Sequence, residues 1–314
     1  MTALLRAADR PLLGIALMLG FCILAPMGDA TAKLLGETIP VAQLVTVRFA
    51  LQVAFLAPLV ALAPHTLRMN RRILALTALR TALHIVGIGA MFLSLVYLPI
   101  AEAVAIAFVM PFLLLLLGKY ALGEEVGSRR LAACAVGFVG TLMVVQPSFA
   151  AFGAPALLPL LVAVVFALFM LVTRTIAKDV APVALQFNSG LMASVVLVPA
   201  LWWLNGTGLP QLDPVLPRGW AWVLLGLLGV LGTTAHLLMT WSLRFAPSAT
   251  LAPMQYLEIP VATLIGWAVF GDLPNGLAAV GIAVTLVAGL YIVMRERRLG
   301  ATPPTAPKVR GVAG

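Results

Sequence analysis

Apolar residues fill ten long stretches of this chain, and short polar links separate them. Each stretch is about as long as the 20 apolar residues that a helix needs to cross about 30 Å of hydrocarbon. The stretches are continuously apolar and do not alternate like barrel strands, so the pattern predicts an all-α membrane protein with ten transmembrane helices. These helices are expected at residues 12–34, 41–63, 73–96, 99–118, 130–146, 155–174, 182–204, 219–241, 248–270 and 275–294.

The composition indicates that little of the chain lies outside a membrane. Hydrophobic residues make up 62% of the 314 residues, charged residues only 10%, and the mean hydropathy is +1.08. Soluble proteins carry about a quarter charged residues. The first stretch is too long for a cleavable signal peptide and carries Asp29 and Lys33 near its far end. We therefore expect a protein without a soluble catalytic domain.

The net charge of +9 marks topology rather than nucleic-acid binding. If the N terminus is cytoplasmic, sixteen of the 20 Lys and Arg residues fall on the cytoplasmic side. Only Lys33 and Arg218 fall outside, and Arg48 and Arg80 lie within stretches. This bias predicts a multi-pass protein of the bacterial inner membrane with both termini in the cytoplasm. Four tryptophans beside the longest link fit an outer interfacial belt: Trp202, Trp203, Trp220 and Trp222.

The second half of the chain repeats the first. Five stretches form one repeat, and five is odd, so the second copy must enter the membrane from the opposite side. Two inverted five-helix repeats are typical of secondary transporters, which bind substrate near the midplane. At an offset of 148 residues, Ser94-Leu95, Pro99 and Gly123-Glu124 match Ser242-Leu243, Pro247 and Gly271-Asp272.

The repeat also predicts the division of the chain. A short cytoplasmic N-terminal segment precedes the first repeat, a linker joins the repeats, and the Pro- and Ala-rich end predicts a disordered, basic cytoplasmic tail. The expected boundaries are 1–11, 12–146, 147–154, 155–294 and 295–314.

Several short runs in both halves resemble one family of transporters. They are Tyr97–Ala103, Pro111, Leu122–Glu125 and Gly137–Gly140, then Pro247–Thr250, Glu258–Pro260 and Phe270–Asp272. Over about residues 12–294 the chain resembles the EamA branch of the drug/metabolite transporter superfamily, with the bacterial aromatic amino-acid exporters as one neighbour. The resemblance implies two inverted repeats around a central cavity, and transport of small metabolites, often outward. Asp272 departs from the pattern, which carries Glu there.

Polar side chains inside the stretches are the candidate site, since such groups are costly in hydrocarbon. Glu258 lies midway along the ninth stretch, between Pro253 and Pro260, which free backbone carbonyls. Its carboxylate is expected to recognise a substrate ammonium or carry a coupling proton, unless it only bonds a neighbouring helix. The predicted substrate-binding residues are His84, His236, Gln255, Tyr256 and Glu258. A packed structural role remains open for His84.

Three further charged residues are candidates for the pathway or gate. Asp29 lines the pathway or pairs with Lys33 four residues on, on the same helix face. Arg48 holds a substrate carboxylate, partners Glu258 or forms a structural bridge. Arg80 lines the pathway or extends to the cytoplasmic surface.

These observations predict a secondary transporter that moves a small metabolite, most readily amino acids and outward, by alternating access. The expected partners are that substrate, the lipid bilayer and a coupling proton, in a monomer or homodimer. No phosphate loop, metal-binding His pair or nucleophile elbow occurs, so the sequence predicts no catalysis, cofactor or metal. The alternatives are an intramembrane enzyme acting on a lipid or isoprenoid substrate, and a scaffold without transport.

Overall fold

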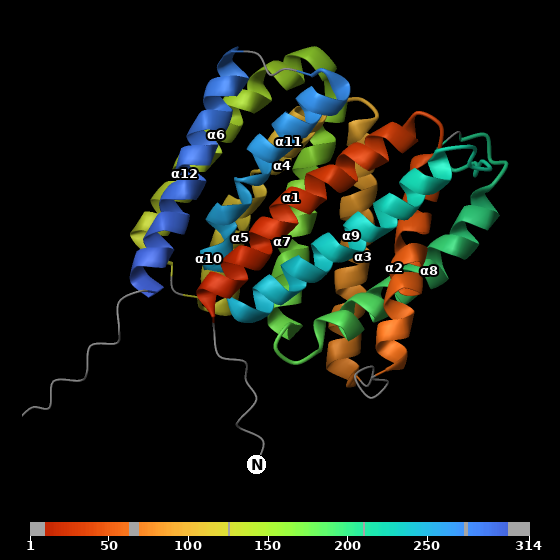
Figure 1. Cartoon of the computed structure of the whole chain (residues 1–314), viewed down its shortest axis with the longest axis horizontal. Coiled ribbons are helices and arrows are strands. Elements are labelled where there is room, and N and C mark those ends of the chain that lie inside the picture. Colours follow the sequence, from red (N-terminus) through yellow and green to blue (C-terminus); the bar gives the residue numbers. More distant parts are fainter. Residues whose placement is uncertain (1–9, 63–68, 125, 210, 273–275, 301–314) are drawn as a thin grey trace, which may run out of the picture.

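A computed structural model describes residues 10–62, 69–124, 126–209, 211–272 and 276–300. This part of the chain is helical and contains no strand (Figure 1). Short 3-10 and π turns at Ala154–Leu157 and Gly266–Phe270 extend α7 and α11. The α-helices are α1 (Pro11–Gly36), α2 (Val41–Ala61), α3 (Arg71–Leu95), α4 (Ile100–Ala107), α5 (Met110–Leu122), α6 (Ser128–Phe152), α7 (Leu158–Ile176), α8 (Pro182–Leu204), α9 (Ala221–Phe245), α10 (Ser248–Gln255), α11 (Glu258–Ile265) and α12 (Gly276–Gly300).

The helices form the ten predicted crossings, and the fourth and ninth crossings are broken. Seven runs of the described residues are individually long and apolar enough to span a bilayer. The fourth crossing breaks between α4 and α5 at Phe108-Val109, and the ninth between α10 and α11 at Tyr256-Leu257. The two breaks are 148 residues apart, which is the offset of the sequence repeat. Each break precedes a proline, Pro111 or Pro260, which cannot bond the carbonyl four residues earlier.

The most extensive contacts between helices are symmetric: exchanging the two halves of the chain maps each of them onto another or onto itself. This exchange relates α1 to α7, α2 to α8, α3 to α9, α4–α5 to α10–α11, and α6 to α12. The contact of α1 with α9 becomes the contact of α7 with α3, and both are among the most extensive in the bundle. The pairs α2 with α8 and α6 with α12 map onto themselves. The architecture is therefore two inverted five-helix repeats, as the sequence predicted.

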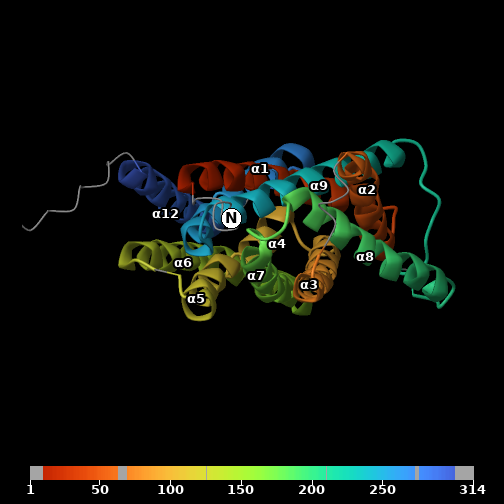
Figure 2. The same cartoon turned by 90° about the horizontal axis from the view of Figure 1, so that it is seen from below.

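The bundle has two layers, with the broken helices partly between them. Seen from below, α1, α9 and α12 lie in one layer, and α3, α5, α6 and α7 in the other (Figure 2). The broken crossings meet across the repeats, since α4 packs on α11 and α5 on α10.

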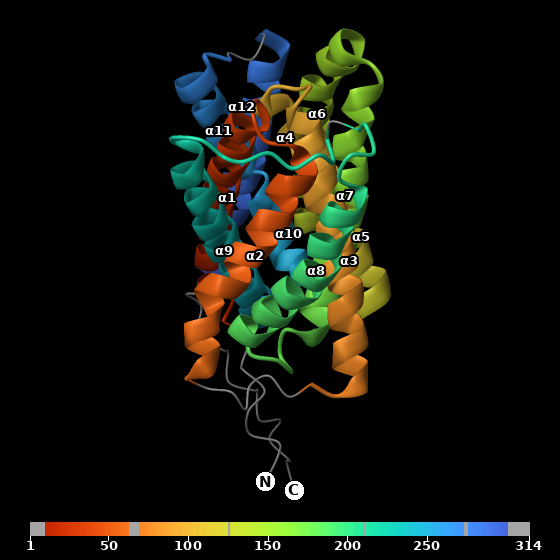
Figure 3. The ribbon, with the colours of Figure 1, turned by 90° about the vertical axis from the view of Figure 1, so that its right-hand side faces the viewer.

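The two ends of the bundle differ in charge. Helix α1 begins and α12 ends at the same end of the bundle, which we call the inner end after the side that the basic residues predict (Figures 1 and 3). At the opposite, outer end, the long link after α8 lies across the bundle (Figure 3). The four tryptophans beside this link are between 58% and 87% exposed, as an interfacial belt requires. The disordered tail was predicted at 295–314; helix α12 continues through residues 295–300, and the rest of the predicted tail lies outside the described residues.

Candidate functional site

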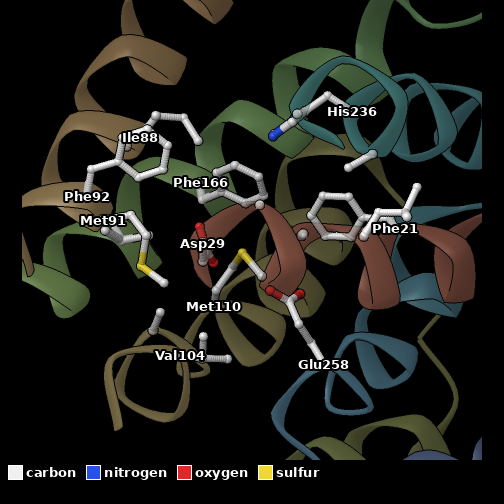
Figure 4. A pocket seen from close by; sticks show the side chains of 18 of the residues that line it. Phe21, Asp29, Ile88, Met91, Phe92, Val104, Met110, Phe166, His236 and Glu258 are labelled. Carbon is white, nitrogen blue, oxygen red and sulfur yellow. The ribbon is translucent and has the colours of Figure 1, made fainter. Parts of the chain in front are cut away.

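A cavity lies between the two repeats at the height of the helix breaks (Figure 4). Side chains of α1, α2, α3, α4, α5, α7, α9 and α11 line it. Its volume is about 80 Å³, which is enough for several waters, whereas sites for larger ligands occupy about 300–1,000 Å³. A bound metabolite therefore requires these helices to move apart. The apolar wall includes four phenylalanines and two methionines: Phe21, Phe92, Phe108, Phe166, Met91 and Met110.

Four of the predicted residues line this cavity: Asp29, Arg48, His236 and Glu258. The carboxylates of Asp29 and Glu258 point into the same space, beside Met110 and Phe166 (Figure 4). Glu258 is 7% exposed and lies in the first turn of α11, directly after the break. No described residue donates a hydrogen bond to its carboxylate. The cavity thus presents two acidic groups to a ligand within an apolar wall.

The cation whose charge acts on Asp29 is Arg48 and not Lys33. The carboxylate of Asp29 and the guanidinium of Arg48 are close enough for their charges to interact. The Nζ atom of Lys33 instead donates to the carbonyl oxygens of Leu95, at 2.9 Å, and Leu98, at 2.7 Å. Although Asp29 and Lys33 are four residues apart on α1, the buried carbonyls at the end of α3 and just after it bind the lysine. The alternative of an Asp29–Lys33 ion pair is therefore wrong.

The position of Arg48 depends on a glycine of the opposite repeat. The guanidinium lies against the backbone of Gly232 on α9, and Nη2 is 3.5 Å from its carbonyl oxygen. A Cβ atom at Gly232 would lie 2.6 Å from Nε of Arg48. Only a glycine leaves room for this side chain between α2 and α9.

We expect Gly232→Ala to reduce transport about tenfold or more, because it displaces the arginine that faces Asp29. Initial rates in proteoliposomes measure the effect, and the melting temperature of the purified variant checks its folding. Gly226→Ala is the matched control, since a Cβ at this position on the same helix has no neighbour within 4 Å. Equal rates for both variants would show that Arg48 has no part in the site.

His84 lies beneath the cavity in a layer of packed rings, with His236 and Phe169, that we call the floor. Its ring centroid is 4.3 Å from that of His236 and 4.6 Å from that of Phe169, and Phe49 packs at 5.0 Å. His84 is fully buried, and neither ring nitrogen has a hydrogen-bond partner in the described structure. His84 therefore does not line the cavity in this conformation, although it contacts a residue that does.

Gln255 and Tyr256 also lie away from the cavity. Nε2 of Gln255 is 3.1 Å from the sulfur of Met170. The hydroxyl of Tyr256 donates to the carbonyl of Cys134, at 3.2 Å. Both side chains are fully buried between helices. In this conformation they pack the helix break that positions Glu258, and their substrate contact stays a prediction.

Arg80 does not reach the inner surface. It is fully buried, and its guanidinium lies 4.5 Å from the ring centroid of Phe169. Arg80 precedes His84 by one turn on α3, so it lies below the floor on the side of the inner end. The alternative in which Arg80 extends to the surface is wrong.

Four residues join three helices at the inner end, and we call them the inner clamp: Glu124, Arg174, Ser248 and Ala249. Oε2 of Glu124 accepts from Oγ of Ser248, at 2.6 Å, and from the amide of Ala249, at 2.9 Å. Oε1 accepts from the Ser248 amide, at 3.2 Å, and from Nε of Arg174, at 3.3 Å. The carboxylate thus satisfies free amides at the start of α10 and ties α5 to α7 and α10.

The local sequence explains how Glu124 reaches α10. Helix α5 ends at Gly123, whose φ of 64° turns the chain back, a conformation that favours glycine. We did not single out Glu124 as a site residue from the sequence. The repeated pair Gly123-Glu124 was the signal that pointed to it.

These features define a helical membrane transporter with inverted repeats. The model of the EamA-like transporter family matches residues 12–146 and 154–295. The chain belongs to this family, within the drug/metabolite transporter superfamily, and is a multi-pass transporter rather than an enzyme.

Curated relatives agree with this assignment, and a solved structure has a similar fold. The chain is 31% identical to a riboflavin transporter of Rhizobium johnstonii, over 71% of this chain and 72% of that protein. It is 24% identical to an S-adenosylmethionine uptake transporter of Rickettsia bellii, over 91% of this chain and 95% of that protein. A crystal structure with 20% identity matches 93% of this chain and 98% of its own, with a TM-score of 0.69, and supports the fold.

Proposed function

We propose that this protein moves a small organic metabolite across the bacterial inner membrane by alternating access. The observation that carries the proposal is the pair of carboxylates, Asp29 and Glu258, in a cavity between two inverted repeats. Inverted repeats allow two conformations of similar energy that open to opposite sides. In the present conformation the floor and the inner clamp separate the cavity from the inner end.

The substrate that suits this cavity has an amino group and an apolar, planar body. The carboxylates of Asp29 and Glu258 suit an ammonium, because charge-assisted hydrogen bonds are strong in an apolar setting. Four phenylalanine rings provide faces for an aromatic group or a cation. Amino acids with aromatic side chains combine both features, and we propose them as the first substrates to test. Riboflavin and S-adenosylmethionine, the compounds in the names of the two relatives, also carry planar rings. They belong in the same panel of test compounds.

The direction of net flux is proposed to be outward, as the sequence resemblance implied. The side chains of the cavity are compatible with export and with uptake, so transport must be measured in both directions. A proton is the proposed coupling ion, since Glu258 provides a carboxylate within the pathway. Both termini are proposed to lie in the cytoplasm, where the basic residues gather; reporter fusions at each end test this arrangement.

Counterflow in proteoliposomes that contain only this protein tests the proposal. Vesicles are loaded with one unlabelled compound of the panel, and entry of the same labelled compound is followed. We expect exchange of phenylalanine or tryptophan well above that of protein-free vesicles, and accumulation that responds to an imposed proton gradient. Exchange of riboflavin alone would refute the amino-acid assignment, and no exchange of any compound would refute the proposed function.

A further inference from the structure

Arg80 is a buried cation whose described partners are all neutral. Its Nε donates to Oγ1 of Thr173 at 2.8 Å, Nη1 to Oγ of Ser189 at 2.7 Å, and Nη2 to Oε1 of Gln186 at 2.6 Å. Oγ1 of Thr240 lies 3.5 Å from Nη2. These acceptors come from α7, α8 and α9, so one side chain of the first repeat is held by three helices of the second. They fix the geometry of the guanidinium without balancing its charge.

No described carboxylate compensates this charge. None lies within ion-pair distance of Arg80, and the nearest part of the site contains Phe169 and His84. Burying an ion without a counter-ion is costly, and in membrane segments such groups are retained where they serve a pathway. Arg48 differs, because the charge of Asp29 acts on it. Of these two membrane arginines, Arg80 is the one on which no described carboxylate acts.

Hydrogen-bonding groups without partners lie near the guanidinium of Arg80. Nε2 of Gln186 has no hydrogen-bond partner, although Oε1 of the same amide accepts from Arg80. Both ring nitrogens of His84, one turn above on α3, are also unpartnered. An amide N–H, an imidazole and a guanidinium are together the groups that bind a carboxylate. Buried polar groups without partners are available to a ligand that enters in another conformation.

We propose that Arg80 is the subsite for the carboxylate of the substrate, occupied when the inner end opens. This inference rests on the proposed function. The floor made by His84, His236 and Phe169 separates Arg80 from the cavity, about 10 Å along α3 below Gly87. Asp29 and Glu258 thus recognise the ammonium on the outer side of the floor, and Arg80 the carboxylate on its inner side. The two ends of a zwitterion are recognised at successive positions.

Binding of matched ligands tests the inference. Phenylalanine and phenethylamine share the ring and the ammonium but differ in the carboxylate, and ligand-dependent shifts of the melting temperature give their dissociation constants. The measurement uses the full chain with Glu124→Gln, which weakens the inner clamp. We expect phenylalanine to bind about tenfold more tightly than phenethylamine, and Arg80→Gln to remove this preference while phenethylamine binding stays within about threefold.

Two variants control for folding and for charge. Arg80→Lys keeps the charge but loses the bidentate geometry, so it retains part of the preference. Arg71→Gln removes an exposed charge at the start of the same helix and leaves the preference unchanged. An unchanged preference in Arg80→Gln, or equal binding of both ligands before this change, overturns this inference alone. A protein that binds neither ligand overturns the amino-acid assignment and this inference with it, whereas transport of another metabolite is tested separately by counterflow.

Discussion

Glu258→Gln is expected to lower transport about 10- to 100-fold, because it removes the charge that faces a substrate ammonium while keeping the size of the side chain. The carboxylate enters the cavity from the first turn of α11, is 7% exposed, and accepts no hydrogen bond from any described residue. The glutamine amide therefore gives up no hydrogen bond within the protein, but it binds a cation much more weakly than the carboxylate does. Initial rates of counterflow in proteoliposomes measure the effect.

Two controls separate recognition from folding and from proton coupling. Glu37→Gln removes an exposed carboxylate at the outer end of α1 and is expected to transport at the original rate. A drop in melting temperature that accounts for the lost activity would assign Glu258 a structural role. Counterflow that persists while gradient-driven accumulation disappears would assign it to proton coupling and not to recognition. Asp29→Asn is expected to act in the same direction but less strongly, since the charge of Arg48 already acts on Asp29.

The sequence predicted the crossings well because the signal for each helix, a long apolar run between polar links, is local. Residues 182–204 were predicted and observed as one helix, and most other boundaries agree within a few residues. The breaks in the fourth and ninth crossings were missed. They lie at Phe108-Val109 and Tyr256-Leu257, which are ordinary helical residues, and the signals were Pro111 and Pro260 beyond them. Proline cannot bond the preceding turn, but only packing decides whether a helix bends or separates there.

The cavity was harder to predict than the helices. Apolar residues cover all sides of these helices, so the sequence does not tell which side faces the partner repeat. Gln255 and Glu258 are three residues apart, yet the break rotates one toward Met170 and the other into the cavity. Ile88 and His84 follow each other by one turn on α3, and only Ile88 lines the cavity. Charge identified the candidates, while tertiary packing selected among them.

Glu124→Gln is expected to open the inner end. The carboxylate accepts hydrogen bonds from Ser248, Ala249 and Arg174, and an amide cannot replace all of them. Losing the charge costs the closed state about 2 kcal/mol, which is roughly a 30-fold shift in the populations of the two conformations. The inner clamp is not part of the cavity, so the effect falls on the balance between conformations and not on binding itself.

Cysteine labelling from each side measures this shift in a background with Cys22→Ala and Cys134→Ala. Ser242→Cys and Thr233→Cys are suitable reporters, because both hydroxyls are buried and unpartnered and both lie on α9. We expect Glu124→Gln to speed labelling at 242 and to slow it at 233. Asp179→Asn, an exposed carboxylate at the same end, is expected to change neither rate. Equal labelling in all variants would show that the inner clamp does not gate the pathway.

The inverted repeat extends this prediction to the opposite conformation. The counterpart of Glu124 is Asp272, which follows Gly271 as Glu124 follows Gly123, and both glycines have positive φ. The counterpart of the start of α10 is the start of α4, which also follows a proline. In the described structure Asp272 does not bond the first amides of α4, and its charge acts on Lys33 instead.

When the inner end opens, the exchange of the halves places Asp272 at the amides of Ile100 and Ala101, where it closes the outer end. Asp272→Asn is therefore expected to act against Glu124→Gln: it slows labelling of Ser242→Cys and speeds that of Thr233→Cys. Combining the two changes should return both rates toward those of the starting protein, because each weakens the closure of one end. If Asp272→Asn leaves the labelling rates unchanged in both backgrounds, the two ends are not closed by equivalent contacts.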